Sequence, residues 1–73
     1  MIKSLDLYDR WAAAYALATG VKLIKIVPGQ WVRYVFDDSG GEASRALGEW
    51  RSSTALVPAK QYASSFRQLR RLA

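Results

Sequence analysis

The sequence contains no cysteine and no histidine among its 73 residues. Without cysteine, the chain can form no disulfide framework, no thiolate nucleophile and no cysteine-zinc site. Without histidine, it also lacks the usual general base and the commonest metal ligand. Most enzyme classes are therefore disfavoured, and we expect no catalytic residues, no metal, no other cofactor and no small-molecule substrate.

Long apolar runs are missing as well. The longest covers residues 11–18, which is far shorter than the roughly 20 residues that a membrane span needs. Residues 1–4 lead directly into a helix-start pattern and do not read as a secretory signal. We therefore expect a cytoplasmic protein that does not contact a membrane.

The chain does contain enough apolar material for one small domain over residues 1–73. Hydrophobic residues make up 51% of it, including three Trp, four Tyr and two Phe. A chain this short buries only about 60% of the surface that its unfolded form exposes, so the core must be thin. The aromatic and aliphatic content nevertheless argues against disorder.

The positive charge is concentrated in the last third of the chain. The formal net charge is +5, although residues 1–50 contain equal numbers of acidic and basic side chains. Residues 51–73 contain no acid, and their bases are Arg51, Lys60, Arg67, Arg70 and Arg71. A segment of one charge sign attracts polyanions, chiefly nucleic acid, and less often acidic lipid or an acidic protein.

The first predicted element is a helix over residues 7–19, with Asp6 as its N-cap and Gly20 as its stop. Helical spacing puts one apolar set on a core face: Leu7, Tyr8, Trp11, Ala14, Tyr15 and Ala18. The opposite side carries Asp9, Ala12, Ala13 and Ala16. Those alanines are either helix formers facing water or a flat surface against which another helix or subunit lies.

Two β-branched and aromatic runs, residues 21–27 and 31–37, predict a hairpin around Pro28-Gly29-Gln30. With a three-residue loop, Val27 faces Trp31 and Lys25 faces Arg33. The core face is then Ile24, Ile26, Val32, Tyr34 and Phe36. A two-residue loop would place Lys25 on the core face instead, so we favour the three-residue loop.

Two further helices follow. Ser39 and Glu42 form a capping box before a helix that ends near Ser52 and packs inward through Ala43, Ala46, Leu47 and Trp50. Residues 54–57 could form a short third strand at a sheet edge, after which Pro58 begins a helix over Ala59–Leu72. The core face of this last helix is Tyr62, Ser65, Phe66, Leu69 and Leu72. The expected fold is α+β, with helices packed on one face of a small antiparallel sheet.

Nearly the whole chain shares structural motifs with one known family. They are Asp6-Leu7-Tyr8, residues 12–15, residues 17–20, Lys22-Leu23-Ile24, residues 32–38 and Val57-Pro58-Ala59, with apolar Leu47, Trp50, Phe66 and Leu69. On these residues the chain resembles a family of short domains of unknown function in bacteria, phages and mobile elements. It departs from the family at Gly40-Gly41 and at residues 51–54, where the family has a glycine-containing turn. The resemblance implies no chemistry, and its mobile-element setting favours DNA transactions only by association.

The last helix carries the first candidate site. Opposite its core face, Lys60, Ser64, Arg67 and Arg71 align at spacings of four, three and four, with Arg70 at the border. One alternative is an ordinary solvated face, in which the helix dipole favours arginine near the C-terminus. Ordinary faces mix charges of both signs, whereas this one does not. The pattern therefore makes this face a candidate for binding phosphate groups.

The outer sheet face is the second candidate, through Lys25, Trp31 and Arg33. Two bases directly across strands repel each other unless something negative lies between them. An indole beside them could stack on a base of a single-stranded nucleic acid. Two alternatives are a helix that covers this face while Lys and Arg reach water, and a homodimer patch.

Two smaller features have simpler explanations. Asp37 and Asp38 stand where carboxylates usually cap backbone N–H groups, and a metal site would need further oxygen ligands. Gly40-Gly41 precedes a helix but lacks the lysine and Ser/Thr of a phosphate-binding loop.

The sequence as a whole predicts a non-enzymatic protein that binds nucleic acid, with single-stranded DNA or RNA favoured. The expected contact residues are Lys25, Trp31, Arg33, Arg51, Lys60, Arg67, Arg70 and Arg71. A helix-turn-helix bound to duplex fits less well, because residues 53–57 are longer than its usual turn. The alternatives are a homodimeric interaction module that buries the alanine face or the outer sheet face, and a small phage-type protein that binds an acidic protein.

Overall fold

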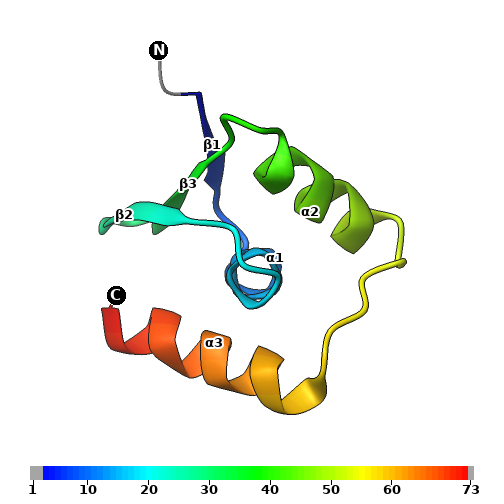
Figure 1. Ribbon diagram of the computed structural model, residues 1–73. Helices are drawn as coiled ribbons and strands as arrows, with labels where there is room; N and C mark the ends of the chain where they lie inside the picture. Colours follow the sequence, from blue (N-terminus) through cyan, green and yellow to red (C-terminus); the bar gives the residue numbers. More distant parts are fainter. Residues whose placement is uncertain (1–2, 73) are drawn as a thin grey trace.

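The computed structural model describes residues 3–72 and shows three helices packed on a three-stranded antiparallel sheet. The elements, in chain order, are β1 (Ser4–Leu7), α1 (Arg10–Ala18), β2 (Leu23–Val27), β3 (Arg33–Asp37), α2 (Glu42–Arg51) and α3 (Ala59–Leu72). The strand order is β1-β3-β2, so β3 is the central strand. Figure 1 shows α1 in the middle of the molecule, with α2 and α3 on either side of it. The predicted α+β class is confirmed.

The start of the chain differs from the prediction. Ser4–Leu7 is a strand rather than the beginning of a helix, and it pairs with β3 from Ser4↔Asp37 to Leu7↔Tyr34. The N-cap of α1 is Asp9, not Asp6: the Asp9 carboxylate accepts the Trp11 backbone N–H at 2.9 Å. The third strand of the sheet is therefore β1, whereas residues 54–57 form no strand.

Helix α1 is buried on almost every side. Its five alanines, Ala12, Ala13, Ala14, Ala16 and Ala18, are each 4% exposed or less. Because an alanine side chain is a single methyl group, the sheet, α2 and α3 can all approach the axis of α1 closely. The interpretation of these alanines as helix formers that face water is wrong, and the alternative of a surface for close helix packing is confirmed. This face is buried within the chain, so a second subunit cannot use it.

The hairpin forms, but its predicted register is wrong by two residues. Val27 lies opposite Arg33 and Lys25 lies opposite Val35, so residues 28–32 make up a longer loop that contains Trp31. An even shift keeps the alternation of faces, and Tyr34 and Phe36 are buried in the core as predicted.

An irregularity in β2 changes the predicted core face further. The register shifts between Leu23 and Lys25, so that Leu23 lies opposite Phe36 and packs against the core. A bulge of this kind turns the extra residue away from its regular face. Ile24, predicted in the core, is accordingly exposed.

Helix α2 begins without the predicted capping box. Its N-cap is Gly41, whose φ of 79° is a left-handed conformation that glycine adopts readily. Asp38 supplies the cap from further upstream, because its carboxylate accepts the backbone N–H of Ser44 at 2.9 Å and the Ser44 hydroxyl at 2.5 Å. The inward packing of Ala43 and Ala46 is confirmed.

Helix α3 spans the predicted residues and lies along α1. Its core face contains buried Ser65 and Leu69, with Phe66 partly buried; the prediction that Leu72 belongs to the core is wrong, since Leu72 is exposed. Polar contacts also join the two helices, because Gln61 donates to the carbonyl of Ala18 and the Tyr62 hydroxyl donates to the carbonyl of Trp11 at 3.0 Å. These contacts hold the core face against α1 and turn the opposite face of α3 outward.

Replacing Ala13 by leucine should destabilise the fold, because Ala13 is fully buried and the added carbon atoms have no free space. Overpacking of this kind costs about 1–3 kcal/mol, which lowers Tm by at least about 4 °C in a domain of this size. Thermal and urea unfolding, followed by circular dichroism, measure the change. The control is Ala63→Leu on the exposed side of α3, which should stay within about 0.5 kcal/mol of the wild type. Equal stability of the two variants would show that α1 is not tightly enclosed.

Candidate nucleic-acid interface

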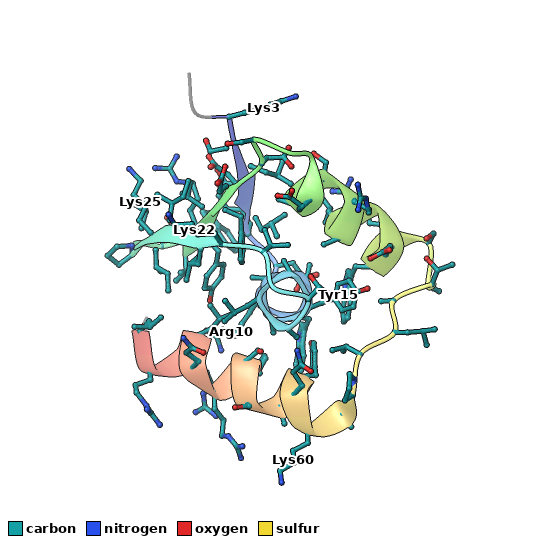
Figure 2. The ribbon with its side chains drawn as sticks, in the orientation of Figure 1. Lys3, Arg10, Tyr15, Lys22, Lys25 and Lys60 are labelled. Carbon is teal, nitrogen blue, oxygen red and sulfur yellow. The ribbon has the colours of Figure 1, made fainter. Side chains whose placement is uncertain are left out.

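The outer face of α3 presents a group of cations to solvent. Lys60, Arg67, Arg70 and Arg71 are all exposed, and Figure 2 shows Lys60 projecting away from the body of the molecule. Arg67 and Arg71 also line a shallow hollow of about 460 Å³, together with Ser64 and Gln68. We call Lys60, Arg67, Arg70 and Arg71 the basic face.

No carboxylate neutralises the basic face within the described chain. Among residues 3–72, the only ion pair joins Arg33 to Asp6, with 3.4 Å between Nη1 and Oδ2. The last turn of α3 holds Arg70 and Arg71, where the negative end of the helix dipole offsets part of their repulsion. Lys60 lies in the first turn and gains nothing from that end of the dipole.

The acids are engaged elsewhere, and none forms an ion pair with the cations of α3 within residues 3–72. Five of the six acidic residues accept a hydrogen bond or an ion pair from groups outside α3: Asp6, Asp9, Asp37, Asp38 and Glu49. Most of these contacts cap helices or turns, and the Glu49 carboxylate accepts the Tyr15 hydroxyl at 2.8 Å. The carboxylates thus stabilise the fold, and the excess positive charge is left on α3.

Tyr15 shows how such a contact works. Figure 2 shows Tyr15 extending from α1 toward α2. Burial, and then the hydrogen bond and negative charge of Glu49, raise the pKa of the Tyr15 hydroxyl. The hydroxyl, which an ordinary tyrosine already keeps protonated at neutral pH, donates a hydrogen bond to Glu49 that ties α1 to α2.

The outer sheet face differs from the predicted arrangement. Lys25 and Arg33 are not directly opposite each other, since their partners are Val35 and Val27. The negative group near Arg33 is Asp6, which belongs to the chain itself. The helices lie on the other side of the sheet (Figure 1), so the alternative of a covering helix does not apply. In Figure 2, Lys25 lies at the left beside the sheet, whereas Lys60 projects from the lower edge of the molecule.

Trp31 lies in the hairpin loop rather than beside Lys25 on the sheet. Its side chain is 75% exposed and lines a hollow of about 380 Å³, which Tyr8 and Trp11 line as well. Tyr8 and Trp11 are 63% and 57% exposed, so the prediction that they belong to the core is wrong. Asp9 offers the missed signal, because a helix that starts there leaves Tyr8 outside it and puts Trp11 in its first turn.

Arg51 lies apart from the basic face. It is the last residue of α2 and lines a hollow of about 510 Å³ that Asp6, Asp9 and Trp50 also line. Since α2 and α3 flank α1 on different sides (Figure 1), Arg51 does not extend the row of cations on α3.

The paired aspartates serve the turn between β3 and α2, as the sequence suggested. Asp37 accepts the backbone N–H of Ser39 at 2.9 Å, and Asp38 accepts that of Ser44. Hydrogen bonds from the Ser39 hydroxyl and then its backbone lower the pKa of Asp37, and those from Ser44 lower the pKa of Asp38 in the same way. Within residues 3–72, no three potential metal-ligating side chains lie close enough together to hold a metal ion.

The fold and its surface define a small basic α+β domain with cations on one helix and exposed aromatic rings nearby. No family model matches the chain, and neither a curated protein nor a solved structure does. The resemblance to short domains of bacteria and phages therefore stays a prediction. None of the helices in the described part of the chain is long and apolar enough to cross a membrane.

The lowered pKa of Asp38 predicts how stability depends on pH. Its contribution is fully present above the unfolded value of about 3.9 and is lost as pH falls through the lower folded value. Wild type should therefore lose stability more steeply than Asp38→Asn on acidification, so that the difference between them shrinks below about pH 4. Urea unfolding at a series of pH values measures this.

Ser44→Ala, which removes the hydroxyl donor, should flatten the pH profile in the same direction. Ser64→Ala on exposed α3 is the control and should leave the profile unchanged. Parallel profiles for wild type and Asp38→Asn would be incompatible with this role of Asp38.

Proposed function

We propose that this protein binds nucleic acid without catalysing a reaction on it, through the basic face of α3. The observation that carries the proposal is the unpaired state of Lys60, Arg67, Arg70 and Arg71 toward every carboxylate of residues 3–72. Phosphate groups accept strong, charge-assisted hydrogen bonds from such side chains, and arginine can bind them in a bidentate manner. Binding would also release the counterions condensed on the nucleic acid, which favours association at low salt.

A single strand suits this arrangement better than a duplex. In a helix-turn-helix, two helices pack against each other across a turn of three or four residues. Here α2 and α3 flank α1 on different sides (Figure 1), and residues 52–58 form the longer connection between them. The exposed indole of Trp31 adds a surface on which an unpaired base could stack.

The remaining predicted cations would contribute less to nucleic-acid binding than the basic face does. Arg33 and Arg51 lie away from α3, and Arg33 already has Asp6 beside it. Lys25 lies on β2, where it lines a hollow with Leu72 at the end of α3, and it is not part of the basic face. In this proposal these cations strengthen the long-range attraction of the protein for a polyanion, and direct phosphate contacts come from the basic face.

A homodimer is the second candidate, and one apolar region favours it. Ile24 and Leu72 are 43% and 57% exposed and line a hollow of about 310 Å³ beside the free edge of β2. A dimer held by apolar contact at this edge would be almost insensitive to salt. Solution mass as a function of protein concentration detects it directly.

Salt titration of oligonucleotide binding tests the proposed function. For a single strand, the slope of log K against log salt is about −0.7 for each phosphate neutralised. Replacing Arg67 and Arg71 together by glutamine should therefore weaken binding and make the slope shallower by about 1.4. Fluorescence anisotropy of a labelled oligonucleotide gives both quantities.

The matched control is Arg45→Gln combined with Arg51→Gln, which removes the same charge from exposed positions on α2. This variant should keep most of the wild-type slope. If the two double variants behave alike, net charge rather than the basic face governs binding. If no strand binds even at low salt, the proposed function is wrong.

A further inference from the structure

Three large aromatic side chains line one hollow at the surface. The hollow of about 380 Å³ lies where the connection before α1, the hairpin loop and α3 meet. Tyr8, Trp11 and Trp31 line it and are each more than half exposed. We call this the aromatic hollow. Its volume falls in the lower part of the range of small-ligand sites, about 300–1,000 Å³.

The floor of the aromatic hollow is held in place by packing. The ring of Trp11 stacks on that of Phe66 from α3, with 4.6 Å between ring centroids and an interplanar angle of 24°. Since this contact covers only part of the indole, the rest of Trp11 faces the hollow. A stacking partner that enters the site therefore meets a ring that is already positioned.

One cation also lies at the aromatic hollow. Figure 2 shows Arg10 extending from α1 into the space between the sheet and α3. The Nε of Arg10 donates to the Tyr34 hydroxyl at 3.2 Å, which fixes the guanidinium while the residue stays exposed. Asp9, which also lines the hollow, accepts the backbone N–H of Trp11 and forms no ion pair with Arg10. The remaining guanidinium N–H groups of Arg10 can therefore donate to a polar base edge.

The aromatic hollow adjoins the basic face. Phe66, which lines the hollow, and Arg70, on the basic face, are four residues apart on α3. At about 100° per residue they lie one turn apart and only about 40° apart around the helix. A strand whose phosphates follow the basic face would therefore pass the mouth of the hollow at its Arg70 side.

We infer that the aromatic hollow holds an unstacked base of a single strand whose phosphates contact the basic face. The inference rests on the proposed function and adds to it where a base is bound. Aromatic rings recognise the π-face of any base, and stacking on them strengthens binding about 5- to 150-fold per base, the equivalent of about 1–3 kcal/mol. Arg10 and the amide of Gln30, which also lines the hollow, supply polar groups for the base edge.

The test compares three ligands with the same number of phosphates in the contacted strand: an oligothymidine, an abasic strand and a duplex. At fixed low salt, the oligothymidine should bind at least about fivefold more tightly than the abasic strand. The duplex should gain no affinity from the hollow, because its paired bases are stacked within the double helix and cannot enter the site. Trp31→Ala and Tyr8→Ala should each reduce the preference for the oligothymidine while leaving affinity for the abasic strand and its salt slope unchanged.

Both substitutions remove exposed side chains, so the variants should fold as the wild type does. Leu56→Ala, which truncates an exposed side chain away from the hollow, is the control and should keep the full preference. Equal binding of the oligothymidine and abasic strands, with the salt slope intact, would overturn the base site and leave the proposed function standing. A preference that survives in both variants would overturn the location of the site. If no strand binds, both proposals fail.

Discussion

The lack of bulk along α1 is the constraint on which the architecture depends. Five alanines allow the sheet, α2 and α3 to close around one helix, which gives a chain of 8.2 kDa a dense interior. Each outer helix then has one face on α1 and another in water. For α3, burial of Leu69 and Ser65 against the interior directs the basic face outward. The exposure of the cations is thus a consequence of how the core is filled.

The positions of the acidic side chains also help to leave the positive charge on α3. Carboxylates at the N-terminus of α1, at the turn before α2 and beside Tyr15 satisfy backbone N–H groups or hydroxyls. An acid used in this way stabilises the fold at its own position and cannot also neutralise a distant arginine. The sheet illustrates the contrast, because Arg33 has Asp6 beside it while the cations of α3 have no such neighbour within residues 3–72. In the proposed function, a polyphosphate partner would supply the missing negative charge.

Much of the fold could be predicted because its signals are local. The bounds of α3 and most of its core face follow from a regular helical spacing, and the two strands of the hairpin follow from their β-branched residues. The alternation of faces on β3 survived an error of two residues in register, since an even shift leaves every side chain on its side. The residues of the basic face could be predicted as well, because they follow the regular helical spacing of α3.

The prediction was wrong where contacts between distant segments of the chain, rather than local sequence, determine the structure. Four residues of β1 are too few to show a period, and the prediction took Asp6 as the N-cap of α1 where the structure has Asp9. Only the pairing of β1 with β3 selects Asp9, and that choice moves Tyr8 and Trp11 from the core to the surface. The aromatic hollow could not be predicted, because it brings together α1, the hairpin loop and α3.

Backbone amide chemical shifts are the most direct measurement of where a ligand binds. They would be recorded on labelled protein while a short single-stranded oligothymidine is added at low salt. The largest changes should fall on the outward residues of α3 and on the residues around Trp31 and Tyr8, with little change along α2. Changes confined to α2 or to the edge of β2, or no changes at all, would contradict a nucleic-acid interface on α3.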